Sequence, residues 1–120
     1  MTAHRRPSIS THVLDTERGE PARGVRVTLE RREGDALVSV ADAATNEDGR
    51  IPDLAGGDLR VGEYRISFDV AGYFARAEGE GGEGSFFRRV TIDFAVEDVG
   101  RHYHVPLLAT RFACSSYRGS

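Results

Sequence analysis

Residues 63–80 read EYRISFDVAGYFARAEGE and contain both kinds of regular structure that we expect in this chain. In their first part, residues 63–70, apolar side chains occupy every second position: Tyr64, Ile66, Phe68 and Val70. This alternation predicts a β-strand with one buried face. In their second part, residues 71–80, two aromatic residues and an alanine fall at helical spacing, and the glycines that follow cannot continue a helix. We therefore predict a strand followed by one short helix.

The alternating strand pattern recurs along the rest of the chain. VRVTLERR (25–32) and RVTIDFAV (89–96) again place their apolar residues on one face, and ISTHVLD (9–15), ALVSVADAAT (36–45) and RHYHVPLL (101–108) complete most of the set. The runs between them, such as TERGEPARG, NEDGR and LAGGDL, are rich in residues that favour turns. Strands of this length and spacing predict an all-β fold, an antiparallel sandwich.

The composition is that of one small domain without a strongly charged surface. At 120 residues the chain can bury one core but is too short for a second folding unit. Its net charge of -3 comes from interspersed acidic and basic residues, so we expect no nucleic-acid partner. All 16 basic residues are arginines, which excludes chemistry that needs a lysine Schiff base.

Cysteine usage and hydropathy favour the cytoplasm. The single cysteine, Cys114, cannot form an internal disulfide, which fits a reducing compartment. The N-terminal MTAHRRPSIS lacks the apolar run of a signal peptide, and no run of about 18 apolar residues occurs anywhere. We therefore expect a cytoplasmic protein with no membrane partner.

Three of the four histidines lie on strand faces that point away from the predicted core. In RHYHVPLL, His102 and His104 alternate with the apolar residues, and in ISTHVLD His12 lies opposite Ile9 and Val13. Three interpretations stay open: solvated surface side chains, a pair of zinc or copper ligands, or proton-transfer groups. No third ligand for a metal can be identified. A polar face of this kind can become an active site if a second subunit covers it.

Two further segments are rich in small and polar residues. EGEGGEGS, residues 78–85, is expected to be a flexible loop and not a phosphate cradle, because its glutamates would repel phosphate and no strand-to-helix pattern surrounds it. The tail YRGS, residues 117–120, is either a frayed terminus or part of a site.

Five segments together resemble the 5-hydroxyisourate hydrolases, the enzymatic relatives of transthyretin. They are ISTHVLDTERGEPARGVRVTL, TNEDGRIPDL, GEYRISFDVAGYF, HYHVPLL and the terminal YRGS. The resemblance runs from about Ser8 to Ser120, which makes residues 8–120 a transthyretin-like hydrolase domain and leaves residues 1–7 as a flexible N-terminal segment. It implies a transthyretin-like sandwich of two four-stranded antiparallel sheets with one short helix. It also implies a homotetramer, a dimer of dimers, whose central channel holds the active sites.

The resemblance also implies the site residues. His12, Arg50 and His104 match the family's catalytic positions, where hormone-carrying transthyretins have lysine, glutamate and threonine. Tyr117 and Ser120 belong to the YRGS tail that closes the family's site, so we expect them to bind substrate.

The chain departs from the family in two places. LLATRFACSS stands where an LLLSPYGYST-like run is common before YRGS, and Arg88 replaces the usual proline after two aromatic residues. We expect both changes to alter local structure more than the chemistry.

The implied reaction opens the six-membered ring of 5-hydroxyisourate, the product of urate oxidation, at an amide carbonyl. It gives 2-oxo-4-hydroxy-4-carboxy-5-ureidoimidazoline and needs a nucleophilic water, a stabilised oxyanion and a protonated leaving nitrogen, so we expect no metal or other cofactor. We assign His104 as the general base, with His12 exchanging protons or orienting the water, and the division of roles between them stays open. Arg50 suits carbonyl or enolate-like oxygens. His102 is expected to be structural or to support the catalytic residues without contacting the substrate.

Two other functions are compatible with the same fold. A carrier would bind a hormone in the channel, and a structural protein would merely expose its histidines to solvent. The set of His12, Arg50 and His104 argues against the carrier.

Overall fold

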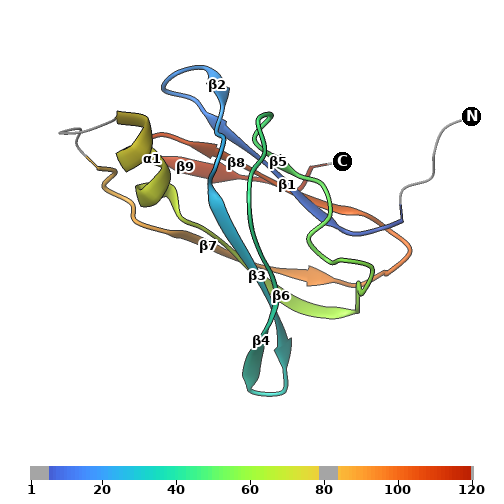
Figure 1. Cartoon of the computed structure of the whole chain (residues 1–120). Coiled ribbons are helices and arrows are strands. Elements are labelled where there is room, and N and C mark those ends of the chain that lie inside the picture. The colour runs from blue at the N-terminus through green and yellow to red at the C-terminus, as the bar shows by residue number, and fades with distance from the viewer. Residues whose placement is uncertain (1–5, 79–83, 120) are drawn as a thin grey trace, which may run out of the picture.

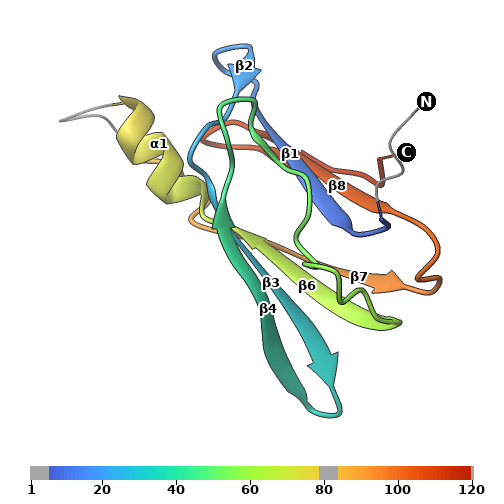
Figure 2. The ribbon, with the colours of Figure 1, turned by 45° about the vertical axis from the view of Figure 1, so that its right-hand side comes forward.

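The computed structural model describes residues 6–78 and 84–119, and within them it contains nine strands and one helix. Two sheets pack against each other, and the helix lies at one end of the sandwich (Figures 1 and 2). The predicted transthyretin-like sandwich with one short helix is therefore confirmed. No helix of the described residues is long and apolar enough to cross a membrane.

The first sheet contains the first and the last strands of the chain and has the order β2-β1-β8-β9. β2 pairs with the end of β1 at Leu14 and Asp15, and β5 pairs with the middle of β1 at Thr11 and His12. Its strands are β1 (Ile9–Asp15), β2 (Glu20–Pro21), β5 (Arg50–Ile51), β8 (Tyr103–Ala109) and β9 (Cys114–Ser116). The prediction of two four-stranded antiparallel sheets needs correction in detail here, because this sheet has five strands and β1 runs parallel to β8. The two strands come from opposite ends of the chain, so no hairpin turn dictates their relative direction.

The second sheet is antiparallel, as predicted, and has the order β4-β3-β6-β7. Its strands are β3 (Arg26–Glu33), β4 (Ala36–Ala44), β6 (Gly62–Phe68) and β7 (Val90–Val96). Sequential strands β3 and β4 form a hairpin, whereas the helix interrupts the chain between β6 and β7.

The core forms from the alternating residues that the sequence singles out. Val27 and Leu29 of β3 and Ile66 and Phe68 of β6 are fully buried, and they meet Ile9 and Val13 of β1 across the sandwich. On β7 the inward-facing Ile92 and Phe94 are only half-buried, because β7 is the last strand of its sheet. The period of two thus identifies the correct face on each of these strands.

The helix α1 spans Val70–Glu78 and begins one residue before the predicted range. The Asp69 carboxylate accepts a hydrogen bond of 3.0 Å from the backbone N–H of Gly72, which caps the first turn and ends the preceding strand at Phe68. Val70 therefore belongs to the helix and not to the strand, although its side chain is buried as expected.

Two sequence predictions fall on residues outside the described part of the chain. The expected flexible loop at 78–85 includes residues 79–83, and the expected flexible segment at 1–7 includes residues 1–5. Of the latter segment, Arg6 pairs with Asp53 at 2.7 Å. Both predictions stay untested.

A buried carboxylate joins the helix to the first sheet. Asp15 at the end of β1 has no exposed surface, and it accepts hydrogen bonds from the Tyr73 hydroxyl at 2.7 Å and from Arg18 Nη1 at 2.8 Å. The backbone N–H groups of Glu17 and Arg18 donate two more, at 3.0 and 3.1 Å. Burial by itself would raise the pKa of Asp15, but the hydrogen bonds from Tyr73 and Arg18 outweigh it, and the pKa is lowered.

We expect Tyr73→Phe to cost more stability than Tyr103→Phe, which is a matched control because both tyrosines are buried. Tyr73 donates to a buried carboxylate, whereas the Tyr103 hydroxyl donates to the neutral backbone carbonyl of Asp98 and accepts from the backbone N–H groups of Glu97 and Asp98. Hydrogen bonds to charged groups contribute roughly 1.5 to 3 kcal/mol and neutral ones about 0.5 to 1.5 kcal/mol. Urea unfolding at pH 7 measures both losses.

The same experiment at low pH tests the role of the Asp15 charge. Because the pKa of Asp15 is lowered on folding, its charge stabilises the fold above the unfolded pKa of about 3.9, and this contribution disappears as the pH falls through the lower folded value. The excess cost of Tyr73→Phe over Tyr103→Phe should shrink over that range. Equal costs at every pH would contradict the assigned role.

Candidate active site

Three of the predicted site residues lie on neighbouring strands of the first sheet. His12 of β1 pairs in register with Arg50 of β5, and His104 of β8 pairs with Ser10, two residues before His12 on β1. Directly opposed residues project from the same face of a sheet. The structure therefore brings His12, Arg50 and His104 together on the face that points away from the core.

The turn before β5 fixes the position of Arg50. The Asn46 side-chain oxygen accepts hydrogen bonds from the backbone N–H groups of Asp48 and Arg50, at 2.9 and 3.0 Å. Gly49 has a φ of 74°, and a Cβ there would lie 2.4 Å from the carbonyl oxygen of Val13. The sequence NEDGR thus forms a turn that only glycine allows to lie so close to β1, and this contact places Arg50 beside His12.

Electrostatics keeps both site histidines neutral near neutral pH. Burial lowers the pKa of His12, the Arg50 guanidinium lowers it further, and a hydrogen bond with the backbone of Asp48 opposes them. Burial also lowers the pKa of His104, followed by the positive charge of Arg50 and the neighbouring rings of His102 and His12. A neutral imidazole has one nitrogen that donates and one that accepts, so each ring can take part in proton transfer or polarisation.

The structure adds Ser10 and Ser8 to the site. Ser10 Oγ lies 2.7 Å from His102 Nε2 and 2.8 Å from His104 Nδ1, and the backbone N–H of Ser8 donates to His102 Nδ1 at 3.0 Å. His102, expected to be structural or to support the catalytic residues, is thus hydrogen-bonded to the site. The period of two places Ser10 on the face of His12, but nothing in the sequence indicates that it lies opposite His104.

The tail YRGS runs beside His104 as far as Gly119. Gly119 forms an antiparallel bridge with His104, and its N–H donates to the His104 carbonyl at 2.9 Å. A Cβ on Gly119 would lie 2.4 Å from His104 Cδ2, so the close approach requires glycine. Ser120, the predicted substrate-binding residue next to it, lies outside the described residues.

The atypical segment LLATRFACSS, residues 107–116, still allows the tail to reach His104. The backbone N–H and Nε of Arg111 donate to the Glu17 carboxylate at 2.5 and 3.1 Å, and Thr110 closes a turn with Ala113 at 2.8 Å. The chain then enters β9 and pairs with β8. Arg88 stands where the family usually has a proline. Its carbonyl accepts a hydrogen bond of 3.0 Å from the N–H of Ala71 in α1.

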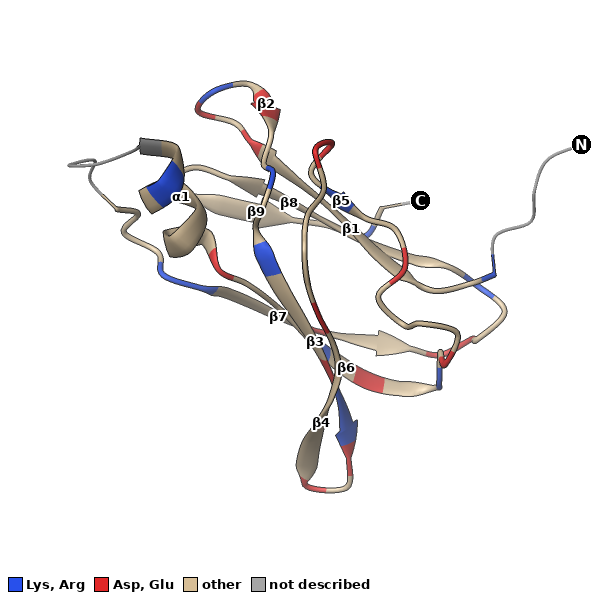
Figure 3. Cartoon of the chain, in the orientation of Figure 1, with Lys and Arg blue, Asp and Glu red and all other residues tan. Residues whose placement is uncertain are grey.

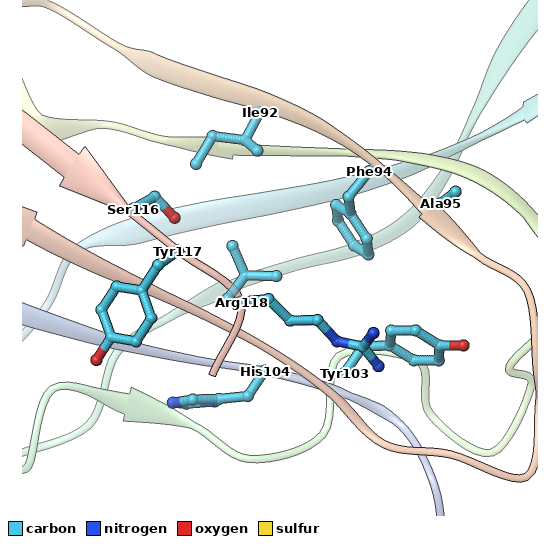
Figure 4. A pocket seen from close by; sticks show the side chains of 9 residues that line it. Ile92, Phe94, Ala95, Tyr103, His104, Ser116, Tyr117 and Arg118 are labelled. Atoms are coloured by element: carbon cyan, nitrogen blue, oxygen red, sulfur yellow. The ribbon is translucent and has the colours of Figure 1, made fainter. Parts of the chain in front are cut away.

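A cavity of about 270 Å³ opens beside His104 between β7, β8 and the tail. It is lined by Ile92, Phe94, Ala95, Tyr103, His104, Val105, Ser116, Tyr117 and Arg118. Figure 4 shows the Arg118 guanidinium beside the Tyr103 ring, and the two lie 4.8 Å apart. The predicted Tyr117 is 59% exposed and shares this cavity with His104, whereas His12 and Arg50 do not line it.

Charged groups are spread over the molecule. Figure 3 shows acidic and basic residues on the second sheet and in the loops, whereas β8 and β9 of the first sheet have none. In the described part of the chain, no group of three or more His, Cys, Asp or Glu side chains is placed to hold a metal ion.

Comparison with known proteins identifies the family. Residues 9–119 match the model of the HIUase/Transthyretin family. This chain belongs to that family. Among curated relatives of the HIUase/Transthyretin family, the 5-hydroxyisourate hydrolase of Deinococcus radiodurans is 46% identical over 122 residues that cover 100% of both chains. The protein of the same name from Caulobacter vibrioides is 41% identical over 112 residues, 93% of this chain and 97% of the relative.

Solved structures of the HIUase/Transthyretin family have the same sandwich. The 5-hydroxyisourate hydrolase of Klebsiella pneumoniae superposes with a TM-score of 0.82 at 38% identity, covering 95% of this chain and 99% of its own. Transthyretin from Sparus aurata reaches a TM-score of 0.86 at 24% identity, covering 96% and 97%. At 24% identity, the similarity to transthyretin shows only that the fold is shared. The residues of the site must therefore distinguish one activity from another within the HIUase/Transthyretin family.

We expect Gly119→Ala to disturb His104 while leaving the core intact. The added methyl group would clash with the imidazole, so either the ring rotates or the tail leaves its bridge. The His104 ring resonances in an NMR spectrum should shift, with little change in melting temperature. Gly84→Ala is the matched control, because its nearest neighbour would be Arg88 Nη1 at an ordinary 3.7 Å. Unchanged His104 resonances in Gly119→Ala would show that the tail does not touch the ring.

Proposed function

We propose that this protein is an enzyme that hydrolyses 5-hydroxyisourate to 2-oxo-4-hydroxy-4-carboxy-5-ureidoimidazoline in urate degradation, a part of purine metabolism. The observation that carries the proposal is the meeting of His12, Arg50 and His104 on one sheet face, in a chain 46% identical over its full length to a protein named 5-hydroxyisourate hydrolase. The small molecule 5-hydroxyisourate is the substrate.

His12, Arg50 and His104 are the catalytic residues in this proposal. Water attacks an amide carbonyl of the ring, the carbonyl oxygen takes up negative charge, and the ring nitrogen leaves with a proton as the carboxylate forms. A neutral histidine takes the proton from the water and returns it to the nitrogen. The fixed cationic fork of Arg50 binds the carbonyl or enolate-like oxygens and stabilises the charge. This scheme uses side chains and water, without a cofactor.

Tyr117 and Ser120 of the tail bind and orient the substrate in this proposal. Support comes from the bridge of Gly119 to His104, which carries the tail across the site, and from Tyr117, which shares a cavity with His104. Arg118 stacks on Tyr103 and so helps to hold the tail in place.

A carrier function has less support. Transthyretin has the same fold, but an arginine, Arg50, beside two histidines of lowered pKa suits polar transition states more than an apolar hormone. A carrier would leave the decay of 5-hydroxyisourate unchanged.

We also propose that four copies form a homotetramer, a dimer of dimers, in the cytoplasm. In the described residues β7 pairs only with β6 and β9 only with β8, so both sheets end in open strands on the side of the cavity. The exposed Phe86 and Phe112 lie close to each other, because the Phe86 N–H donates to the carbonyl of Arg111, which precedes Phe112, at 2.8 Å. A second subunit over the face of His12 and His104 would exclude water from the site. The single cysteine fits the cytoplasm.

The activity is tested by following the ultraviolet decay of freshly generated 5-hydroxyisourate with and without the protein. We expect rapid decay with the wild type and losses in kcat of about 10² to 10⁴-fold for His12→Ala and for His104→Ala, since general acids and bases contribute on that scale. Arg50→Lys should also be defective, because an ammonium cannot replace the paired hydrogen bonds of a guanidinium. An uncatalysed rate with the wild type would refute the proposal, and wild-type turnover in a variant would remove that residue from the mechanism.

Light scattering tests the assembly. We expect a mass about four times the 13.1 kDa of the chain. A monomer at the concentration of the assay would contradict the shared channel.

A further inference from the structure

A second cavity lies on the outer face of the second sheet, on the opposite side of the sandwich from the site histidines. Thr28 of β3 pairs in register with Ser67 of β6, and both alternate with buried residues, Leu29 and Ile66, so their hydroxyl groups point away from the core. They line a cavity of about 490 Å³. The other residues that line it are Arg26, Asp69, Ala71, Arg88 and Arg89.

Two consecutive arginines, Arg88 and Arg89, supply guanidinium groups to this cavity. Arg89 directly precedes β7 and lies on its outward face with Thr91, because Val90 and Ile92 pack against the core. Arg88 lies in the irregular chain before β7, and the bond from the N–H of Ala71 to its carbonyl holds it beside the first turn of α1. Neither guanidinium forms an ion pair or hydrogen bond with another described residue, so within that part of the chain both charges are unpaired.

The other charged groups of the cavity already have partners. Arg26 donates to the Asp42 carboxylate from Nε at 3.0 Å and from Nη2 at 2.7 Å, and Asp69 accepts from the N–H of Gly72. Three arginines thus face a single aspartate around the cavity, which makes its lining positive. The N–H groups of Ala71 and Gly72 are both occupied, so this charge comes from side chains and not from the helix terminus.

The cavity continues into a neighbouring one of about 310 Å³ on the same face of the sheet, and the two share Thr28, Ser67 and Arg89. We call the two together the outer groove. The second cavity adds Glu30, Ser39, Asp42, Arg65 and Thr91. Arg65 is paired with Asp93 at 2.7 Å, so carboxylates and hydroxyls dominate this end of the outer groove, whereas unpaired guanidinium groups dominate the other.

A row of hydroxyl groups forms the floor of the outer groove. Thr28, Ser67 and Thr91 lie side by side on β3, β6 and β7. Ser67 Oγ is 3.2 Å from Thr91 Oγ1, while the Thr28 hydroxyl has no partner among the described residues. None of the described residues that line the outer groove is aromatic, so a nucleobase would find no ring on which to stack.

We propose that the outer groove binds a phosphorylated sugar, with the phosphate between Arg88 and Arg89 and the sugar along the row of hydroxyls that begins at Thr28. Guanidinium groups form paired, charge-assisted hydrogen bonds with phosphate oxygens. Hydroxyls and carboxylates can donate to and accept from the many hydroxyl groups of a sugar. This binding function is additional to the proposed hydrolysis and does not depend on it, because none of these residues belongs to the candidate active site.

Arg88 makes the outer groove a property of this chain more than of the fold. The residue stands where the family usually has a proline, and proline would retain the carbonyl that accepts from Ala71. It would remove one of the two unpaired guanidinium groups. We therefore expect relatives with proline at this position to bind a phosphorylated sugar more weakly.

Titration of the wild type tests the proposal, with ribose 5-phosphate as the probe and calorimetry at low ionic strength as the measurement. We expect saturable binding, weaker binding of inorganic phosphate, and no binding of ribose, because the phosphate supplies most of the attraction and the sugar adds to it. Adenosine 5′-monophosphate should bind no more tightly than ribose 5-phosphate, since no ring lines the outer groove. Absence of saturable ribose 5-phosphate binding would overturn the proposal, as would equal affinities for phosphate and ribose 5-phosphate.

Arginine variants test where the phosphate binds. Arg88→Gln, Arg88→Pro and Arg89→Gln should each weaken ribose 5-phosphate binding by at least about 10-fold, because each removes charged hydrogen bonds to the phosphate. Arg101→Gln is the matched control, since Arg101 is also exposed but lies in the turn after β7, outside the outer groove. Wild-type affinity in all three test variants would show that the phosphate binds elsewhere.

The sugar end and the location are tested separately. Thr28→Val keeps the shape of the side chain but loses a neutral hydrogen bond, so it should weaken ribose 5-phosphate binding about 2 to 10-fold. In proton–nitrogen NMR spectra the amides of Thr28, Ser67 and Thr91 should shift on titration. Shifts confined to His12, Arg50 and His104 would place the ligand in the candidate active site and refute the outer groove, whether or not the protein hydrolyses 5-hydroxyisourate.

Discussion

The parallel pairing of β1 with β8 is the constraint on which the site depends. It holds seven residues of each strand in register, from Ile9 opposite Tyr103 to Asp15 opposite Ala109. β5 attaches to β1 and brings Arg50, while β9 and Gly119 attach to β8 and bring the tail. A shift of one residue would turn His104 into the core and its apolar neighbours outward, so burial of the sandwich core also fixes the register of the site.

The protein stabilises an ionised side chain at the buried end of β1 and neutral side chains on the outer face of β1 and β8. At the end of β1 the ionised Asp15 is buried but receives hydrogen bonds from Tyr73, Arg18 and the backbone, so its charge is stabilised. On the outer face the histidines lie near Arg50, which favours their neutral forms. Neutral rings next to a permanent cation suit a reaction in which negative charge develops on a carbonyl oxygen.

The fold is shared by a 5-hydroxyisourate hydrolase and by transthyretin, which has been solved in complex with thyroxine, so the fold cannot account for the activity by itself. The sandwich of Sparus aurata transthyretin superposes on this chain as closely as that of the Klebsiella pneumoniae hydrolase. In this chain the side chains that can distinguish these proteins' activities are those of His12, Arg50 and His104 on one face of the first sheet, beside the contact of Gly119 with His104. The proposed function therefore rests on these outward-facing residues and not on the fold.

The sequence by itself determined which residues face the core, because a strand's period of two and a helix's spacing are local properties. It therefore predicted the sandwich, the helix and the outward direction of His12, His102 and His104, while the motifs HYHVPLL and YRGS indicated the family. Only the tertiary structure decided which outward residues meet. Ser10 and His104 are 94 positions apart, and the parallel direction of their strands has no local signal, so the hydrogen bond between them could not be predicted. The need for glycine at position 119 likewise follows from a contact between distant segments and not from any local turn.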